Sequence, residues 1–308
     1  MILLISSKNS YATKRLIQEV RIKKFRSSFA NQPSHKATGG QEASADKVRV
    51  LDIKDLVKLK FKVPVKKGDV LYVRNPYLEG KADFLPQVIK LAKAFKKAGG
   101  RVVDSNITKG DLGKGKWEDY KKLKLAGIPI PKTMKYEAGI INYELPSTTQ
   151  PSTLNPIILK WIYGLKGRSV FLIKSYEDIK RIPSSIPKKE LLVQNYIQAE
   201  YEYKVVVVSF KALPKVLRFK TLNTGFKIDY VKHELLERSK ARKVCILAEK
   251  AAKTLGRELC KVDILERKGK FYVLEVNRFP GLQGFEKLMK YNVFKAFLEY
   301  LQRRTKLV

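Results

Sequence analysis

Cysteine and histidine are scarce in this chain of 308 residues, and long apolar runs are absent. Two cysteines, Cys245 and Cys260, are too few for a disulfide framework or a zinc ribbon, so we interpret both as core residues. The two histidines, His35 and His233, form no recognisable Ser–His–Asp or Cys–His arrangement, which argues against a side-chain nucleophile. The apolar start at residues 1–5 is too short for a signal peptide, and no later run approaches the ~18 residues of a spanning helix. We therefore expect a cytoplasmic protein that does not enter a membrane.

Acidic residues are also few, because 29 Asp and Glu stand against 64 Lys and Arg, for a net charge of +35. This charge points to an acidic partner: nucleic acid, an anionic surface, an acidic protein tail or a phosphorylated substrate. The sequence has no aromatic-studded RNA-binding motif and its lysines are spread along the chain, which argues against a nucleic-acid-binding module. With 44% hydrophobic residues the chain can bury substantial cores.

Strands and helices alternate in the first third of the chain. Strands are predicted at MILLIS, VRVLDI, DVLYVR and RVVDS, and helices run through Arg15 to Phe25 and along LPQVIKLAKAFKK up to Gly99. Residues 27–46 are polar and rich in turn formers. This alternation predicts a parallel sheet within an α/β (α+β) fold. The predicted domains are residues 1–105, 106–187 and 188–308.

Two polar residues interrupt the apolar stretch FYVLEVN, namely Glu275 and Asn277. Strand alternation places both side chains on one face. The upstream stretch KVDILER predicts a hairpin, and a turn centred on Gly269 would set Asp263 directly opposite Glu275. Like charges at that spacing are destabilising unless a positive group lies between them.

Two interpretations of this hairpin stay open at this point. Oxygen-bearing Asp, Glu and Asn side chains suit Mg²⁺ or Mn²⁺. The alternative is a solvated face on which Lys261 and Arg278 are the counter-charges.

A second turn has the composition of a phosphate site. In PIILKWIYGLKGRSVFLI, Lys160 precedes a turn that contains Gly164 and Gly167. Glycines let backbone N–H groups approach phosphate oxygens, and a lysine adds a point charge. By itself the pattern favours a plain hairpin.

In this order, the segments resemble the ATP-grasp ligases and, within them, the RimK-like family, which joins amino acids to protein or peptide carboxylates. The strongest match is VDILERKGKFYVLEVNRFPGLQGFEKL, and its matching residues are Asp263, Glu275, Asn277, Pro280, Gly281 and Leu282. The resemblance implies an ATP-grasp fold of three domains, with the nucleotide in a cleft between the central and C-terminal domains. It also implies that Asp263, Glu275 and Asn277 bind two Mg²⁺ or Mn²⁺ ions.

The resemblance assigns further nucleotide contacts one residue at a time. Lys116 and Lys160 resemble the two nucleotide lysines, and Glu202 resembles the acidic residue at the ribose. The segment that would hold adenine by its backbone is Gln194, Asn195, Tyr196 and Ile197. The phosphate-covering loop would contain Gly164 and Gly167. Arg218, as the catalytic residue, and Asn223 resemble the pair near the γ-phosphate.

Three departures from the family pattern concern these positions. Asn195 stands where the family usually has Glu. The loop at residues 164–169 is expected to be a mobile lid that closes over phosphate, and Ser169, which replaces a usual glycine, would make it stiffer. The segment between Arg218 and Asn223 is short and lacks the usual histidine and double glycine, which affects the acceptor more than the ATP chemistry.

The function implied is an ATP-dependent carboxylate–amine ligase that forms an acyl phosphate and then an amide. ATP, an amino-acid donor such as glutamate, and an acidic protein or peptide acceptor are the expected partners. One alternative is ligation to an amino-group carrier protein or small peptide, and a second is a nucleic-acid-binding protein without ligase activity. The sequence leaves a homo-oligomer open.

Overall fold

The computed structural model describes residues 1–6, 10–30, 48–52, 65–74, 85–109, 115–137, 156–163, 169–222, 228–278 and 280–306. Contacts divide the chain into two compact units, which are described separately below: unit 1 is Met1–Leu112 with Phe279–Val308, and unit 2 is Gly113–Arg278. The predicted boundaries differ, because the end of the chain was placed in a domain 188–308. In the structure it belongs with the N-terminal residues.

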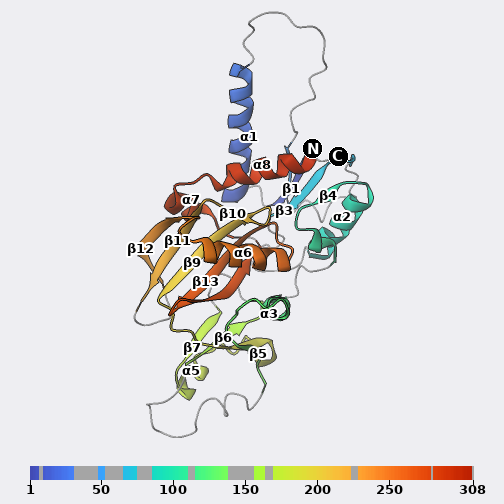
Figure 1. Cartoon of the computed structure of the whole chain (residues 1–308). Coiled ribbons are helices and arrows are strands. Elements are labelled where there is room, and N and C mark those ends of the chain that lie inside the picture. The colour runs from blue at the N-terminus through green and yellow to red at the C-terminus, as the bar shows by residue number, and fades with distance from the viewer. Residues whose placement is uncertain are drawn as a thin grey trace, which may run out of the picture. The chain divides into compact units, whose positions relative to one another are not determined.

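Unit 1 has a four-stranded parallel sheet in the order β2-β1-β3-β4, which confirms the predicted parallel α/β unit (Figure 1). Its strands are β1 (Ile2–Ser6), β2 (Val48–Asp52), β3 (Val70–Val73) and β4 (Arg101–Val102). Its helices are α1 (Tyr11–Ala30), α2 (Leu85–Lys97), the 3₁₀ helix η2 (Ser105–Lys109), α7 (Gln283–Met289) and α8 (Val293–Lys306).

Helix α2 packs one apolar face on the unit 1 sheet through Val88, Leu91, Ala92 and Phe95. The chain then leaves the helix at two glycines. Gly99 adopts φ +84°, and Gly100 approaches Phe95 so closely that a Cβ atom would lie 2.3 Å from its ring.

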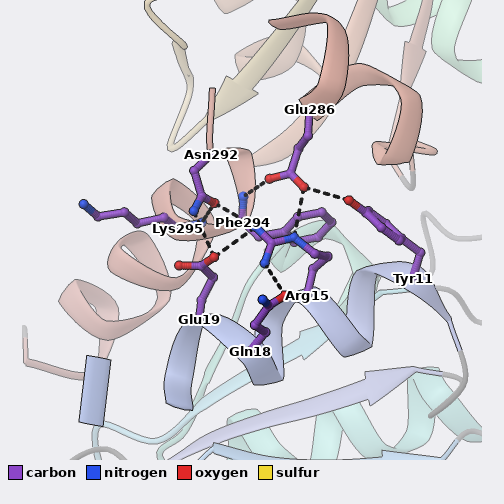
Figure 2. A network of polar contacts seen from close by, with 8 residues as sticks. All are labelled: Tyr11, Arg15, Gln18, Glu19, Glu286, Asn292, Phe294 and Lys295. Atoms are coloured by element: carbon purple, nitrogen blue, oxygen red, sulfur yellow. Dashed lines mark hydrogen bonds and ion pairs between the residues drawn. The ribbon is translucent and has the colours of Figure 1, made fainter. Parts of the chain in front are cut away.

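Helices from the two ends of the chain meet in unit 1, where α8 lies beside α1 (Figure 1). Figure 2 shows the polar network that joins them, centred on Arg15 and Glu286. Glu286 accepts hydrogen bonds from Tyr11 Oη at 3.0 Å and from Arg15 Nε at 3.2 Å. Arg15 also pairs with Glu19 at 2.9 Å, and Asn292 Nδ2 donates to Glu19 at 2.9 Å. Each charge in this network therefore has a partner of opposite sign.

Unit 2 contains a large sheet in the order β12-β11-β9-β13-β14, with β10 paired to β9. Its strands are β9 (Tyr201–Val208), β10 (Lys211–Ala212), β11 (Lys215–Thr221), β12 (Ile228–Glu237), β13 (Leu259–Arg267) and β14 (Lys270–Asn277). Helices α3 (Gly115–Leu125) and α6 (Arg242–Thr254) share an apolar core with one face of this sheet. That core contains Tyr203, Val262 and Val276, so the residues that alternate with them lie on the opposite face.

A smaller antiparallel sheet in unit 2 has the order β5-β8-β6-β7. Its strands are β5 (Thr133–Lys135), β6 (Ile157–Trp161), β7 (Val170–Ile173) and β8 (Leu191–Asn195), and the short helices α5 (Tyr176–Lys180) and η3 (Lys188–Glu190) lie between β7 and β8. The antiparallel pairing of β6 and β7 confirms the predicted strand–turn–strand arrangement after Lys160. Within the described ranges, no helix has both the length and the apolar character needed to cross a membrane.

The β13–β14 hairpin reaches the predicted pairing by a different route. Its turn has two residues, Lys268 and Gly269, both with positive φ, so the prediction of a turn centred on Gly269 is wrong. Such a turn would by itself shift the register by one residue. A bulge at Leu274 restores it, because Ile264 pairs with Val273 whereas Asp263 pairs with Glu275.

Candidate functional site

Asp263 and Glu275 are cross-strand partners, and Asn277 lies two residues further along the same face. Asn277 Nδ2 donates a hydrogen bond of 3.1 Å to Asp263 Oδ2. The Asp263 side chain is buried, and its second oxygen, Oδ1, accepts no hydrogen bond. We call these three residues the carboxylate cluster.

Lysines supply the counter-charges of the carboxylate cluster. Lys261 Nζ lies 3.0 Å from Asp263 Oδ1, and Lys204 Nζ lies 3.6 Å from the same oxygen. Lys116 Nζ lies 3.9 Å from Glu275 Oε1. The counter-charge expected at Lys261 is therefore present, and the repulsion expected between Asp263 and Glu275 is offset by ammonium groups.

Lys116 is held at the start of α3 by a close backbone approach. Its N–H donates to Ile162 O at 3.4 Å, next to the end of β6. The preceding Gly115 has φ +74°, and a Cβ atom there would lie 2.4 Å from Ile162 Cγ2. Only glycine allows this approach without a shift of Ile162 or of the α3 backbone. Gly115 therefore fixes the position of the first turn of α3, and with it Lys116.

Lys160 lies within β6 and is only 6% exposed. Its Nζ donates to Tyr120 Oη at 3.3 Å and lies over the Tyr120 ring. Burial lowers the pKa of Lys160 to about 8, although the negative charges of Glu275, Glu202 and Asp263 oppose the shift. These three carboxylates, which belong to strands of the large sheet, therefore favour the charged form of Lys160.

Two residues of this site were not predicted from the sequence. Tyr120, on α3, donates to Leu274 O at 2.9 Å, and burial raises its pKa. Lys204, on β9, is 7% exposed and lies 2.5 Å from Glu202 Oε1. The sequence signal that could have identified Lys204 is its position as a single lysine in the apolar run YKVVVV, two residues after Glu202.

The segment predicted to hold adenine follows the small sheet. Gln194 is buried at the end of β8 and donates to Thr133 Oγ1 at 2.8 Å. The N–H groups of Asn195 and Tyr196 donate to Lys132 O and Pro156 O, so neither is available to a ligand. Ile197 follows directly, and its carbonyl accepts from Ala199 N at 2.8 Å.

Arg218 is not brought to the carboxylate cluster. It pairs in register with Tyr203, which lies on the helix-covered face, so its side chain is on the other side of the sheet. There it forms an ion pair with Glu234 and lies over the Tyr201 ring, lining a pocket of about 350 Å³ at the start of α6. Gly164, Gly167 and Asn223 lie outside the described residues, as does the predicted lid except Ser169.

The model of the RimK-like ATP-grasp domain matches residues 114–301, which is more than half of the chain. The chain belongs to the RimK-like ATP-grasp family. The matched range contains the carboxylate cluster together with Lys116, Lys160 and Lys204.

Curated relatives agree with this assignment. A Pasteurella multocida protein named probable alpha-L-glutamate ligase is 28% identical over 196 residues, which cover 61% of this RimK-like chain and 60% of the relative. A Vibrio vulnificus protein of the same name is 24% identical over 262 residues, covering 75% and 82%. The chain thus spans less than two thirds of the length of the first of these relatives.

Solved structures show that the RimK-like chain has the ATP-grasp fold along its whole length. The ATP-grasp ligase PsnB, complexed with minimal precursor, Mg and ADP, is 16% identical with a TM-score of 0.67, covering 99% of this chain and 98% of that one. A RimK domain protein from Sphaerobacter thermophilus has a TM-score of 0.62 at 16% identity, covering 97% and 98%. The macrocyclase MdnC from Microcystis aeruginosa, bound with its precursor peptide, has a TM-score of 0.64 at 11% identity, covering 98% and 100%.

The chemistry of the cluster fits a hard divalent cation in this RimK-like chain. Three oxygen-bearing side chains converge, and Asp263 Oδ1 is buried without a hydrogen bond. The described residues contain no group of three or more His, Cys, Asp or Glu arranged for a metal, so the proposed donors are two carboxylates and one amide oxygen.

Proposed function

We propose that this chain is an ATP-dependent carboxylate–amine ligase that forms an amide bond and releases ADP and phosphate. The observation that carries the proposal is the convergence of the carboxylate cluster with the buried Lys160 and with Lys116. Cations that can face phosphates and oxygens that can hold a metal are what ATP-dependent transfer requires, because its catalysis is mostly positioning and charge stabilisation.

Asp263, Glu275 and Asn277 would hold the Mg²⁺ or Mn²⁺ of the nucleotide, two ions by the family resemblance. When bound, such ions neutralise phosphate oxygens. Asp263 Oδ1, which is buried and accepts no hydrogen bond, and the hard character of all three donors support this assignment.

The lysines would bind and orient the phosphates. Tyr120 holds Lys160 through a 3.3 Å contact, and the close approach at Gly115 fixes the start of α3 and so Lys116. Lys204, which already faces Asp263 and Glu202, can offset negative charge on the transferring phosphoryl group. The family resemblance gave this role to Arg218. The backbone at 194–197, apart from the engaged N–H groups of Asn195 and Tyr196, would hold adenosine together with Glu202. The loop at 164–169 with Asn223 would cover the phosphates.

The reaction proposed has two displacements. An acceptor carboxylate oxygen attacks the γ-phosphorus, and the bond to the β-phosphate breaks, which gives an acyl phosphate and ADP. An amine then attacks the acyl carbon, loses a proton and expels phosphate. Neither displacement needs a side-chain nucleophile, in agreement with the scarcity of histidine and cysteine.

An acidic peptide or protein is the proposed acceptor, and an amino acid such as glutamate is the proposed donor. The names of the curated relatives support glutamate. The net charge of +35 supports an acidic acceptor, since complementary charge speeds encounter. The likeness to the ligase PsnB, complexed with minimal precursor, and to the macrocyclase MdnC, bound with a precursor peptide, supports a peptide over a free metabolite or a carrier protein.

The test is ADP release from Mg-ATP with each amino acid in turn and with acidic peptide, carrier-protein or nucleic-acid acceptors. We expect release that depends on one amino acid and an acidic peptide, and amide formation by mass spectrometry. Lys160→Met should abolish it, whereas Lys174→Met, at an exposed lysine directly after β7, should not. Tight nucleic-acid binding without ADP release from any pair would overturn the proposal.

A further inference from the structure

Arg74 is buried in unit 1 without a counter-ion. Its side chain is 6% exposed, and its guanidinium makes one hydrogen bond, from Nη2 to Pro280 O at 2.5 Å. The Nη1 atom is buried and has no hydrogen-bond partner, and Arg74 forms no ion pair in the described part of the chain. Leaving an ionised group buried and unpaired is costly, so this guanidinium is incomplete without an anion.

Two other arginines of this chain, one partly buried and one buried, show what a paired arginine looks like. Arg15 is paired with Glu19 and Glu286 in the network of Figure 2. Arg257, in unit 2, contacts both oxygens of Asp119 at 2.7 and 2.9 Å. The carboxylates of Glu19 and Glu286 are engaged by the Figure 2 network, and that of Asp69 by the N-terminal ammonium at 2.7 Å. None of these three described carboxylates is therefore free to pair with Arg74, which leaves its guanidinium open to an anionic ligand.

The position of Arg74 in the sheet is one where ligands bind. Arg74 follows β3 directly, and Ser6 ends β1; Ile5 pairs with Val73, so these two residues stand next to each other at the carboxyl ends of their strands. The strand order β2-β1-β3-β4 reverses between β1 and β3, which makes this the switch point of the sheet. In open parallel sheets, ligands bind beyond the carboxyl ends of the strands at such a point.

Hydroxyl groups lie at the same end of β1. Ser6 Oγ is 3.4 Å from Ser10 Oγ, which in turn is 2.7 Å from Thr13 Oγ1. Ser10 also accepts from the Thr13 N–H at 3.2 Å and so caps the start of α1. Hydroxyl donors, a helix start and a guanidinium at one sheet edge are complementary to a planar oxyanion.

We propose that Arg74, with the hydroxyls of Ser6 and Ser10, binds a carboxylate of an acidic amino acid or acidic peptide. The residues of this site all belong to unit 1, and none of them is a member of the carboxylate cluster. The identity of the ligand as a ligase substrate rests on the proposed function. Binding of a carboxylate by Arg74 does not, and it is measured without nucleotide or metal.

The experiment is calorimetric titration of the full chain with L-glutamate, with a tri-glutamate peptide and with inorganic phosphate, in the absence of ATP and Mg²⁺. We expect the carboxylate probes to bind, and Arg74→Met to weaken them about tenfold to a hundredfold, as for other hydrogen bonds to charged groups. Arg101→Met is the matched control, because Arg101 also donates to a backbone carbonyl, Arg304 O at 2.9 Å, and should leave binding unchanged.

A second variant covers a failure of Arg74→Met to fold. Arg74→Lys keeps the charge but loses the planar fork, so it should fold and bind the peptide more weakly than wild type. Equal carboxylate binding by wild type and Arg74→Lys, binding of phosphate alone, or no binding of either carboxylate probe would overturn the proposal. A chain that binds glutamate through Arg74 but releases no ADP with any pair would overturn the proposed function alone.

Discussion

Single lysines carry much of the positive charge that faces the carboxylate cluster. Lys261 and Lys204 both face Asp263 Oδ1, and Lys116 faces the more exposed Glu275 at 3.9 Å. Asp263 is therefore the better neutralised of the two carboxylates in the chain without ligand. Substitutions at the two carboxylates and at their lysines should separate a metal site from a structural ion pair.

Glu275→Gln should cut ligase turnover by about 10² to 10³ while leaving the fold intact, because it removes one proposed metal ligand but only a long, half-exposed ion pair. Thermal melts with and without Mg-ATP measure both effects, since a ligand of the folded form raises its melting temperature. Glu177→Gln, in the exposed pair with Lys180, is the control. A variant that melts lower without ligand and still gains the full Mg-ATP stabilisation contradicts the metal assignment.

Lys261→Met should raise the affinity for Mn²⁺, because the ammonium nearest to Asp263 competes with a cation for the same oxygen. Titration of Mn²⁺ followed by electron paramagnetic resonance measures this affinity. Lys268→Met, in the turn of the same hairpin, should leave it unchanged. Weaker Mn²⁺ binding by Lys261→Met would mean that Lys261 supports the metal site and does not compete with it.

Lys160 should give nucleotide binding a pH dependence centred near 8. Its lowered pKa of about 8 leaves an ammonium at pH 7 and mostly a neutral amine at pH 9, so affinity for ATP should fall as the pH rises through 8. Stability of the free chain should change in the opposite direction. Between pH 8 and the usual lysine pKa the unfolded chain binds more protons, so this group adds stability as the pH rises. Binding and melting curves from pH 6.5 to 9.5, compared with Lys160→Met, check both signs.

At the level of elements, strand alternation was the most informative part of the sequence. It placed Glu275 and Asn277 on one face of the strand, and the structure confirms that Glu275 pairs with Asp263 across the hairpin. The two-residue turn and its bulge were missed because Lys268 is a residue that rarely adopts positive φ. Lys204 was missed because one lysine among 64 basic residues carries little signal until the strand across from it is known.

Gly115→Ala should destabilise the chain by about 1 to 3 kcal/mol, since it combines positive φ with a contact of 2.4 Å to Ile162. It should also weaken ATP binding by moving Lys116. Gly127→Ala is the matched control, because Gly127 has φ +64° but nothing within 4 Å of the added atom. Urea unfolding and ATP titration of both variants separate backbone strain from displacement of α3. Equal losses in the two variants would show that the Ile162 contact is unimportant.

At the level of the whole molecule, the C-terminal residues belong to the same unit as the N-terminal residues. Residues that follow β14 complete unit 1 through α7 and α8, and the polar network of Figure 2 joins them to α1. Sequence order could not predict this division, because the contacts that decide it, such as Arg15 with Glu286, span most of the chain. The α/β class and the parallel sheet were predictable because each depends on local periodicity.

Truncation after Arg278 should unfold unit 1 and spare unit 2. The cut removes α7 and α8, so Arg15 loses Glu286 and Glu19 loses Asn292, although the pair between Arg15 and Glu19 stays. It also uncovers the apolar side chains of β1 and β3. Hydrogen exchange should show rapid exchange of β1 and β3 amides and retained protection of β9 and β13. Slow exchange of β1 in the truncated chain would mean that the N-terminal part is stable by itself.

The bulge at Leu274 makes the hairpin tolerant of one kind of genetic change. On either side of it the pairing is continuous, so an in-frame deletion of codon 274 would leave Asp263 opposite Glu275 and Asn277 in place. What the deletion would remove is the carbonyl that accepts from Tyr120, and with it the link from this hairpin through Tyr120 to Lys160. Gene variants that differ in length here can therefore keep the carboxylate cluster unchanged and still differ in how firmly Lys160 is held.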